Sequence, residues 1–437
     1  MRRGAESLWG FPRKNRLPDP ILWSPAGPVV GLSYHAPRIE SAKRNATDMS
    51  TAVQNPSSER ATSDRYSDAA NAREAALCCP VDYDPQYLKI IPQEVLERDY
   101  GCGDPSRYVN SGDRVLDLGS GGGKICFIAS QIVGATGSVI GVDMNREMLN
   151  LARAAAPKVS QRSGYGNVEF LRGRIQDLKL DMDQLDGWME KHPITGVDSL
   201  DALEDIKAEM RRDAPMIPDG SIDIVVSNCV LNLVREEDKR QLIDEIYRVL
   251  DVGGRIAISD IVSDEVVSDE LKADPKLWSG CISGAFHEAD LLEQLERAGF
   301  YGIEIDKWED EPFAVVDGIE FRSVTITGTK GKEGACLEAN EAVIYRGPWK
   351  QVVDDDGHTL VRGERTAVCA KTYKIFKTDP YRAQIIPVPP RVAVSPEDRT
   401  EFDCCRSHRR DPRETKGHDY RETRETREPG EEGSSCC

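Results

Sequence analysis

The chain has 437 residues, enough for two or three domains, but its hydrophobic fraction of 39% and charged fraction of 30% indicate that part of it is not packed. Its 75 acidic residues against 57 basic ones give a formal net charge of -18, which repels phosphate, argues against a nucleic-acid partner and favours small-molecule chemistry. No apolar run reaches the roughly 18 residues that a spanning helix needs, so we expect no membrane partner.

Residues 1–70 are rich in Pro, Ser, Arg and Asn and lack a sustained hydrophobic period, which predicts a largely disordered extension. The basic bias of its first residues is shared by transit peptides, but Glu6 and Asp19 oppose that interpretation. We favour an upstream extension without a function of its own, with Met49 as the real start.

Strands and helices alternate through residues 71–300, which predicts an α/β domain with a doubly wound, mostly parallel sheet and helices on both faces. Helical stretches around a break at Cys78-Cys79-Pro80 precede the sheet. Residues 180–217 form an acidic insert, expected as helix or loop, and a helix over 287–299 follows the last parallel strand. The expected strands are 114–118, 139–142, 168–171, 222–226 and 255–260, and the expected helices between them are 123–133, 146–156 and 235–250.

Beyond residue 300 the pattern changes to the alternation of β-strands, which predicts a smaller β-rich C-terminal region over residues 301–392. Its clearest strand is Phe321 to Thr327. From residue 393 to residue 437 the charges are mixed and Arg-Glu-Thr repeats, without an apolar face, so we expect a solvated, disordered tail.

A glycine turn follows the first expected strand, in the stretch Val-Leu-Asp-Leu-Gly-Ser-Gly-Gly-Gly at 115–123, where a backbone can approach a ligand closely. Asp143 ends the second strand, where an acid accepts hydrogen bonds from ribose hydroxyls. The glycine spacing is G-x-G-x-G, whereas a pyrophosphate site uses G-x-G-x-x-G. Asp117 beside the turn would repel pyrophosphate and suits a cation. Each feature alone is explained by a tight turn or a helix cap. Their occurrence together and in this order favours a ligand that is a phosphate-free nucleoside with a sulfonium group.

This combination resembles the S-adenosylmethionine-dependent methyltransferases with a doubly wound sheet. The resemblance implies that the glycine loop lies under the methionine part, that the acid after the second strand binds the ribose and that the loop after the third strand borders the adenine. The residues expected to bind the cofactor are therefore Asp117, Gly119, Gly121, Gly123, Asp143, Met144, Ile175, Gln176 and Asn228.

The twelve cysteines would indicate a disulfide scaffold in a short secreted chain, but this chain is long and shows no signal-peptide pattern. We therefore expect a reducing, cytoplasmic setting with thiols available for metal, metalloid or redox chemistry. Cys229 follows the fourth strand, at the sheet edge where ligands bind, and Cys102 and Cys281 lie in glycine-flanked loops. Cys126 and Cys369 fit the ordinary role of a small buried hydrophobe. The absence of a C-x-x-C pair argues against zinc.

Three cysteine motifs make the resemblance more specific. Tyr-Gly-Cys-Gly at 100–103, Ser-Asn-Cys-Val at 227–230 and Gly-Cys-Ile-Ser-Gly-Ala at 280–285 resemble the cysteine motifs of arsenite methyltransferases, and the Cys78-Cys79 pair ahead of them is similar to that family as well. The resemblance covers about residues 75–390.

The resemblance implies that Cys102, Cys229 and Cys281 hold trivalent arsenic as the substrate, in keeping with the preference of soft ions for thiolates. It also implies that Cys78 or Cys79 relays the substrate or forms a disulfide that returns the methylated product to the trivalent state. Thioredoxin or glutathione would then restore the thiols. The spacing does not say which of the two adjacent cysteines acts.

Two other functions stay open from the sequence. A methyltransferase of the same fold that acts on a quinone, a sterol or a small acid would need no thiols at its site. A thiol-based metalloid-binding protein would have a cofactor loop that no longer works. We expect a monomer; the number of methyl groups added, acceptance of antimonite and the roles of Cys404, Cys405, Cys436 and Cys437 are not fixed by the sequence.

Overall fold

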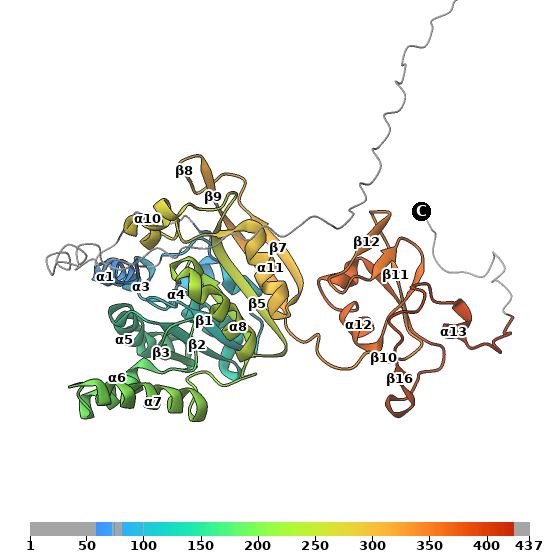
Figure 1. The fold of residues 1–437 in the computed structure, drawn as a ribbon, viewed down its shortest axis with the longest axis horizontal. Coiled ribbons are helices and arrows are strands. Elements are labelled where there is room, and N and C mark those ends of the chain that lie inside the picture. Colours follow the sequence, from blue (N-terminus) through green and yellow to red (C-terminus); the bar gives the residue numbers. More distant parts are fainter. Residues whose placement is uncertain (1–57, 72–73, 75–80, 99, 424–437) are drawn as a thin grey trace, which may run out of the picture. The chain divides into compact units, whose positions relative to one another are not determined.

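The computed structural model describes residues 58–71, 74, 81–98 and 100–423 (Figure 1). The expectations for residues 1–57 and for Cys78, Cys79, Cys436 and Cys437 concern residues outside this part of the chain. None of the helices in the described part has the length and apolar character needed to cross a membrane.

A nine-stranded sheet forms the centre of the larger domain, and its main strand order is β3-β2-β1-β4-β5-β9-β7 (Figure 1). The first five strands in this order pair in parallel. β9 then pairs with β5 in antiparallel fashion, and β7 pairs with β9 in the same way. The predicted doubly wound, mostly parallel sheet is confirmed. The strands are β1 (Arg114–Leu118), β2 (Ser138–Asp143), β3 (Val168–Arg172), β4 (Ile222–Asn228), β5 (Leu250–Ser263), β6 (Phe286–His287), β7 (Tyr301–Trp308), β8 (Ala314–Val316) and β9 (Ile319–Thr329).

Successive residues of the central strands point to opposite faces, and each face packs on its own set of helices. Val115 belongs to the core with α4 (Lys124–Val133) and α5 (Arg146–Ser163). Leu116 belongs to the core with α8 (Lys239–Val249) and α11 (Glu288–Ala298). Fully burying a side chain of this size contributes roughly 1.5–3 kcal/mol. The continuous apolar run of each strand is therefore explained by burial on both faces.

The insert between β3 and β4 is helical, within the expectation for residues 180–217, and consists of α6 (Met182–Lys191) and α7 (Val197–Asp213). The guanidinium of Arg211 on α7 hydrogen-bonds the carboxylate of Asp177. The remaining short helices of this domain are α2 (Pro85–Leu88), α3 (Gln93–Leu96), α9 (Asp269–Lys272) and α10 (Pro275–Ser279).

The prediction that residues 1–70 form a disordered extension is wrong for its last part, because Ser58–Asn71 form helix α1. This helix contacts α5 and α10. Ala69 and Ala70 are buried there against Met148. The helix escapes prediction because its sequence is polar, and hydrogen bonds such as Arg65 to Ser279 and Ser67 to Glu147 help to anchor it.

The boundary expected at residue 300 also differs from the structure. The strands after it belong to the central sheet, because β9 pairs with β5 over nearly its whole length, from Arg255↔Thr329 to Ser263↔Phe321. The separate β-rich region therefore begins only after β9. Its elements are β10 (Leu337–Glu338), β11 (Ala342–Tyr345), β12 (Gln351–Val353), β13 (Thr359–Val361), β14 (Arg365–Ala367), α12 (Ala370–Ile375), β15 (Ile385–Val388), β16 (Thr400–Glu401) and α13 (Pro412–Lys416).

The first part of the predicted solvated tail is folded as well. Strand β16 pairs with β10, and Arg410 is fully buried. Its guanidinium bonds the carboxylates of Glu338 at 2.9 Å and Glu414 at 2.7 Å. A buried charge is tolerated only when it is paired, so these two carboxylates hold Arg410 and its segment in the fold. From the sequence alone, this segment was distinguished only by its mixed charges.

Candidate active site

The glycine turn after β1 adopts a backbone that other residues rarely take. Gly119, Gly121 and Gly123 have φ angles of 67°, 50° and 88°, in the left-handed region. A Cβ on Gly119 would overlap Val230, the residue after Cys229, whereas a Cβ on Gly121 would meet nothing within 4 Å. The turn is therefore pressed against the Cys229 segment on one side and open on the other.

The open side of the turn faces a pocket that is partly open to solvent. The expected cofactor-binding residues line it, with Gly123 as the exception. A Cβ on Gly123 would lie 2.6 Å from Phe170, so close packing behind the turn explains this glycine. The lining includes Asp117, Gly119, Gly121, Asp143, Met144, Ile175, Gln176, Asn228 and Cys229.

Two carboxylates, those of Asp117 and Asp143, line this pocket together with Arg98 and Arg174. Asp143 accepts hydrogen bonds from the backbone N–H groups of Gly121 at 2.9 Å and Asn145 at 2.7 Å, and burial raises its pKa. Asp117 is buried and accepts a hydrogen bond from the thiol of Cys126 at 3.1 Å. Burial, and then the charge of Asp117, raise the pKa of Cys126, which remains a thiol. Carboxylates in such a setting attract a cation.

Helix α1 brings residues to the pocket that the sequence did not indicate. Thr62, Ser63 and Tyr66 line it. The hydroxyl of Tyr66 lies 3.9 Å from the sulfur of Cys281, and its ring packs edge-on against Tyr100 at 6.3 Å. Burial raises the pKa of Tyr66 well above its usual value, so it stays a neutral phenol. No motif marks this segment, and only the fold places it here.

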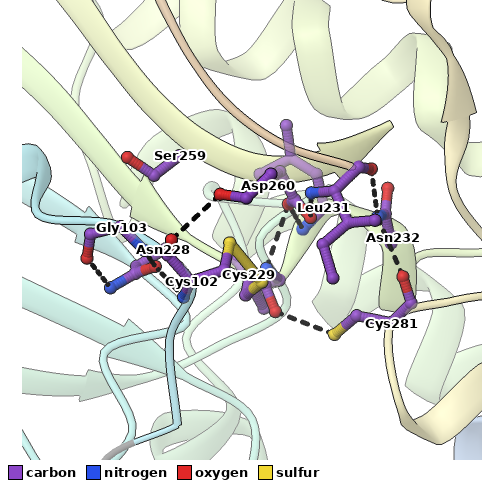
Figure 2. Close-up of a disulfide and its surroundings, with 12 residues drawn as sticks. Cys102, Gly103, Asn228, Cys229, Leu231, Asn232, Ser259, Asp260 and Cys281 are labelled. Atoms are coloured by element: carbon purple, nitrogen blue, oxygen red, sulfur yellow. Dashed lines mark hydrogen bonds between the residues drawn. A yellow bond between two sulfur atoms is a disulfide. The ribbon is translucent and has the colours of Figure 1, made fainter. Parts of the chain in front are cut away.

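Three cysteines that lie far apart in the sequence, Cys102, Cys229 and Cys281, meet beside the pocket. Figure 2 shows Cys102 and Cys229 joined as a disulfide, with a Cα–Cα distance of 5.9 Å. The thiol of Cys281 donates to the carbonyl of Cys229 at 3.0 Å (Figure 2). All three side chains are buried, and Cys229 also lines the cofactor pocket.

Two of these cysteines have an unusual backbone. Cys229 has a φ of 59° and Cys281 a φ of 61°, in the left-handed region, which costs roughly 1–2 kcal/mol for a residue other than glycine. The carboxylate of Asp260, at β5, accepts hydrogen bonds from the N–H groups of Val230 and Leu231 that follow Cys229. Asn232 donates to the carbonyl of Cys281 at 3.2 Å. These contacts offset the strain and hold both thiols in place.

Asn228 lines the pocket, as expected for a cofactor residue, and its side chain also holds the Cys102 loop. Its Oδ1 accepts hydrogen bonds from the N–H groups of Cys102 at 2.9 Å and Gly103 at 3.1 Å, and its Nδ2 donates to the carbonyl of Gly103 at 2.7 Å (Figure 2). A Cβ on Gly101 would overlap the Asn228 side chain, and one on Gly103 would lie 2.5 Å from Ser259. The glycines around Cys102 therefore let the Cys102 loop approach Asn228 and Ser259 closely. Asn228 positions this loop and also lines the pocket.

Asp260 gives this region a testable pH dependence. Burial raises the pKa of Asp260 to about 6, although hydrogen bonds from three backbone N–H groups lower it. An unfolded Asp titrates near 3.9, so between about pH 4 and 6 the folded state holds the extra proton. The stabilisation that Asp260 contributes is then lost as pH rises through this window, by about 1.4 kcal/mol per pH unit and about 3 kcal/mol in all. We expect the difference in unfolding free energy between wild type and Asp260→Asn, measured with urea, to shrink accordingly; a difference independent of pH would contradict this assignment.

The fold, the glycine turn and the pocket with its two carboxylates define an S-adenosylmethionine-dependent methyltransferase, and residues 109–299 match a family model described as a methyltransferase domain. An arsenite methyltransferase from Aquipseudomonas alcaligenes is 34% identical over 322 residues, which cover 70% of this chain and 82% of that protein. An arsenite methyltransferase from Homo sapiens is 31% identical over 307 residues, covering 66% and 71%. The chain belongs to the arsenite methyltransferase family.

Two further similarities accompany this assignment. The X-ray structure of an arsenic(III) S-adenosylmethionine methyltransferase from Chlamydomonas reinhardtii aligns with a TM-score of 0.49 and 26% identity, and the match covers 74% of this chain and all of that one. Residues 332–420 match a family described as a domain of unknown function, which corresponds to the separate β-rich region together with the folded start of the tail.

Proposed function

We propose that this protein methylates trivalent arsenic held by the thiolates of Cys102, Cys229 and Cys281. The observation that carries the proposal is the meeting of these three cysteines, from three distant segments, beside the pocket. Cys229 belongs both to the thiol cluster and to the lining of the pocket. Arsenite and its glutathione adduct are the substrates that this set of soft ligands favours.

The residues of the pocket fit S-adenosylmethionine. A Cβ at Gly121 would project into the open space, so the turn leaves room for a ligand against its backbone. Asp143 keeps lone pairs for ribose hydroxyls, and Asp117 and Asp143 favour a positive charge. When bound, S-adenosylmethionine supplies an electrophilic methyl group on a sulfonium sulfur.

Arsenic can bind only after the disulfide between Cys102 and Cys229 is reduced. Two electrons and two protons are needed, and a dithiol of the thioredoxin class or two glutathione molecules supply them and become a disulfide. Arsenite then condenses with three thiols, and each As–S bond formed breaks one As–O bond and releases one water molecule. A glutathione adduct exchanges its thiols instead and releases glutathione.

Three sulfur ligands in a pyramid leave the lone pair of arsenic free to act as the nucleophile. The chain needs to hold this lone pair toward the pocket, and orientation of this kind contributes up to roughly 7–11 kcal/mol in favourable cases. The backbone contacts of Asp260 and Asn232 fix two of the ligand-bearing turns. Tyr66 covers the thiol of Cys281 and limits the access of water.

Methylation takes arsenic formally from the trivalent to the pentavalent state, and two further electrons return it. We propose that a pair of thiols supplies them by forming a disulfide, with Cys78 or Cys79 as one partner, and that thioredoxin or glutathione resets the pair. These steps suit a monomer in a reducing compartment such as the cytoplasm.

The test is incubation of the full chain with arsenite, a thiol reductant and methyl-labelled S-adenosylmethionine, followed by speciation of the arsenic products. Labelled methylarsenicals are the expected result. Cofactor binding without methyl transfer to arsenite would favour a metalloid-binding protein instead. Transfer to a quinone or a small acid, unaffected by Cys229→Ser, would favour a different acceptor.

A further inference from the structure

The region that matches the domain of unknown function holds three more cysteines, and two of them, Cys336 and Cys369, share one small apolar cluster. Cys336 lies just before β10, and its carbonyl accepts a hydrogen bond from the N–H of Phe402 at 2.8 Å, just after the paired strand β16. Cys404 follows two residues later on the same segment. Cys369 comes from a third segment, the residue before α12, and packs with Ala367 and Phe402 in a small apolar cluster that Cys336 also contacts.

Cys336 and Cys369 are both free thiols, and Cys336 packs against the small apolar cluster that holds Cys369. The sulfur of Cys369 accepts a hydrogen bond from the N–H of Thr372 at 3.5 Å and lies 3.3 Å from its hydroxyl. Burial raises the pKa of Cys369, but these hydrogen bonds outweigh it and lower the pKa below the usual value for a thiol. Burial, and then the charge on Cys369, raise the pKa of Cys336. One sulfur of the pair is thus prepared to become a thiolate.

The pair is open on one side. Cys369 is buried, Cys336 is half-buried and Cys404 is exposed, so accessibility increases from one thiol to the next. A single buried cysteine would be explained as a small hydrophobe, but two free thiols that share one small apolar cluster, one of them half-buried, offer two ligands to a soft ion.

We propose that Cys336 and Cys369 form a second thiol site that binds trivalent arsenicals. A monosubstituted arsenical condenses with the two thiols, and two As–S bonds replace two As–O bonds as two water molecules leave. No electron is transferred, so no reductant is consumed. The choice of arsenic among soft ions rests on the proposed function, whereas the dithiol geometry does not.

Alkylation of the reduced full chain tests this site, because Cys336 is accessible enough to react. Phenylarsine oxide, which takes two thiols, is expected to slow the alkylation of Cys336 at least about tenfold, read from the mass of its peptide. Cys369→Ser should abolish this protection, because it removes the second thiol but keeps an oxygen that can cap α12. Cys405→Ser, the matched control at an exposed cysteine, should leave the protection intact.

Equal alkylation of Cys336 with and without phenylarsine oxide, or protection that persists in Cys369→Ser, would overturn the second site. Circular dichroism and thermal unfolding of Cys369→Ser show that lost protection does not arise from unfolding. The result is independent of methyl transfer. A chain that protects Cys336 but makes no methylarsenical would contradict only the proposed function, and the reverse outcome would contradict only this site.

Discussion

Replacement of any one of Cys102, Cys229 and Cys281 by serine is expected to reduce the methylation of arsenite by at least about 100-fold. A hydroxyl is a poor ligand for a soft ion, so arsenic would keep two sulfur ligands and lose the orientation that three impose. Binding of S-adenosylmethionine should change little in Cys281→Ser, because Cys281 does not line the pocket. Initial rates with labelled S-adenosylmethionine and calorimetric titration of the cofactor separate the two effects.

Cys405→Ser is the matched control for these variants. It makes the same chemical change at an exposed cysteine outside the thiol cluster. It should therefore retain the wild-type rate. Full turnover by all three variants of the cluster would contradict the role of the thiolates, whatever the fold of the protein.

Asp143→Ala is expected to weaken the binding of S-adenosylmethionine strongly. A hydrogen bond to a charged group contributes about 1.5–3 kcal/mol, so removing each hydrogen bond to the ribose should raise the dissociation constant roughly 10- to 150-fold. The substitution also removes the acceptor for the N–H of Gly121, so the glycine turn loses an anchor. Isothermal titration calorimetry of the cofactor measures the effect directly.

Asp244→Asn provides the control for this prediction, because Asp244 lies exposed on α8. Its dissociation constant for the cofactor should match the wild-type value. Asp143→Asn adds a finer comparison, since the amide keeps the size of the side chain but has only one acceptor oxygen. An unchanged affinity in Asp143→Ala would remove this carboxylate from the cofactor site.

The sheet could be predicted because its signals are local. Each parallel strand is a short apolar run, and the run at Val115 ends directly in a glycine turn. The membership of β9 in this sheet could not be predicted, because it depends on pairing with β5, a partner distant in sequence. Helix α1 escaped prediction for a related reason, since its polar sequence carries no apolar period and it docks through small residues, Tyr66 and hydrogen bonds to distant segments.

The pocket residues and the three cysteines could be predicted from motifs, whereas the groups that hold the thiols could not. Asp260 and Asn232 act through hydrogen bonds to backbone groups of other segments, and such bonds leave no pattern in the sequence. Asn228 was expected at the pocket, but its hydrogen bonds to the Cys102 loop could not be predicted, because they join segments distant in the sequence. Residues that hold the thiols through contacts with distant segments can be identified only once the three-dimensional structure is known.

X-ray absorption at the arsenic K-edge tests the central claim most directly. The sample is the reduced full chain, loaded with less than one equivalent of arsenite, in a Cys336→Ser and Cys369→Ser background that removes the second site. Three sulfur neighbours around arsenic are predicted, and two when Cys281→Ser is added. Arsenic that keeps oxygen ligands, or a sulfur count that Cys281→Ser leaves unchanged, would contradict the account.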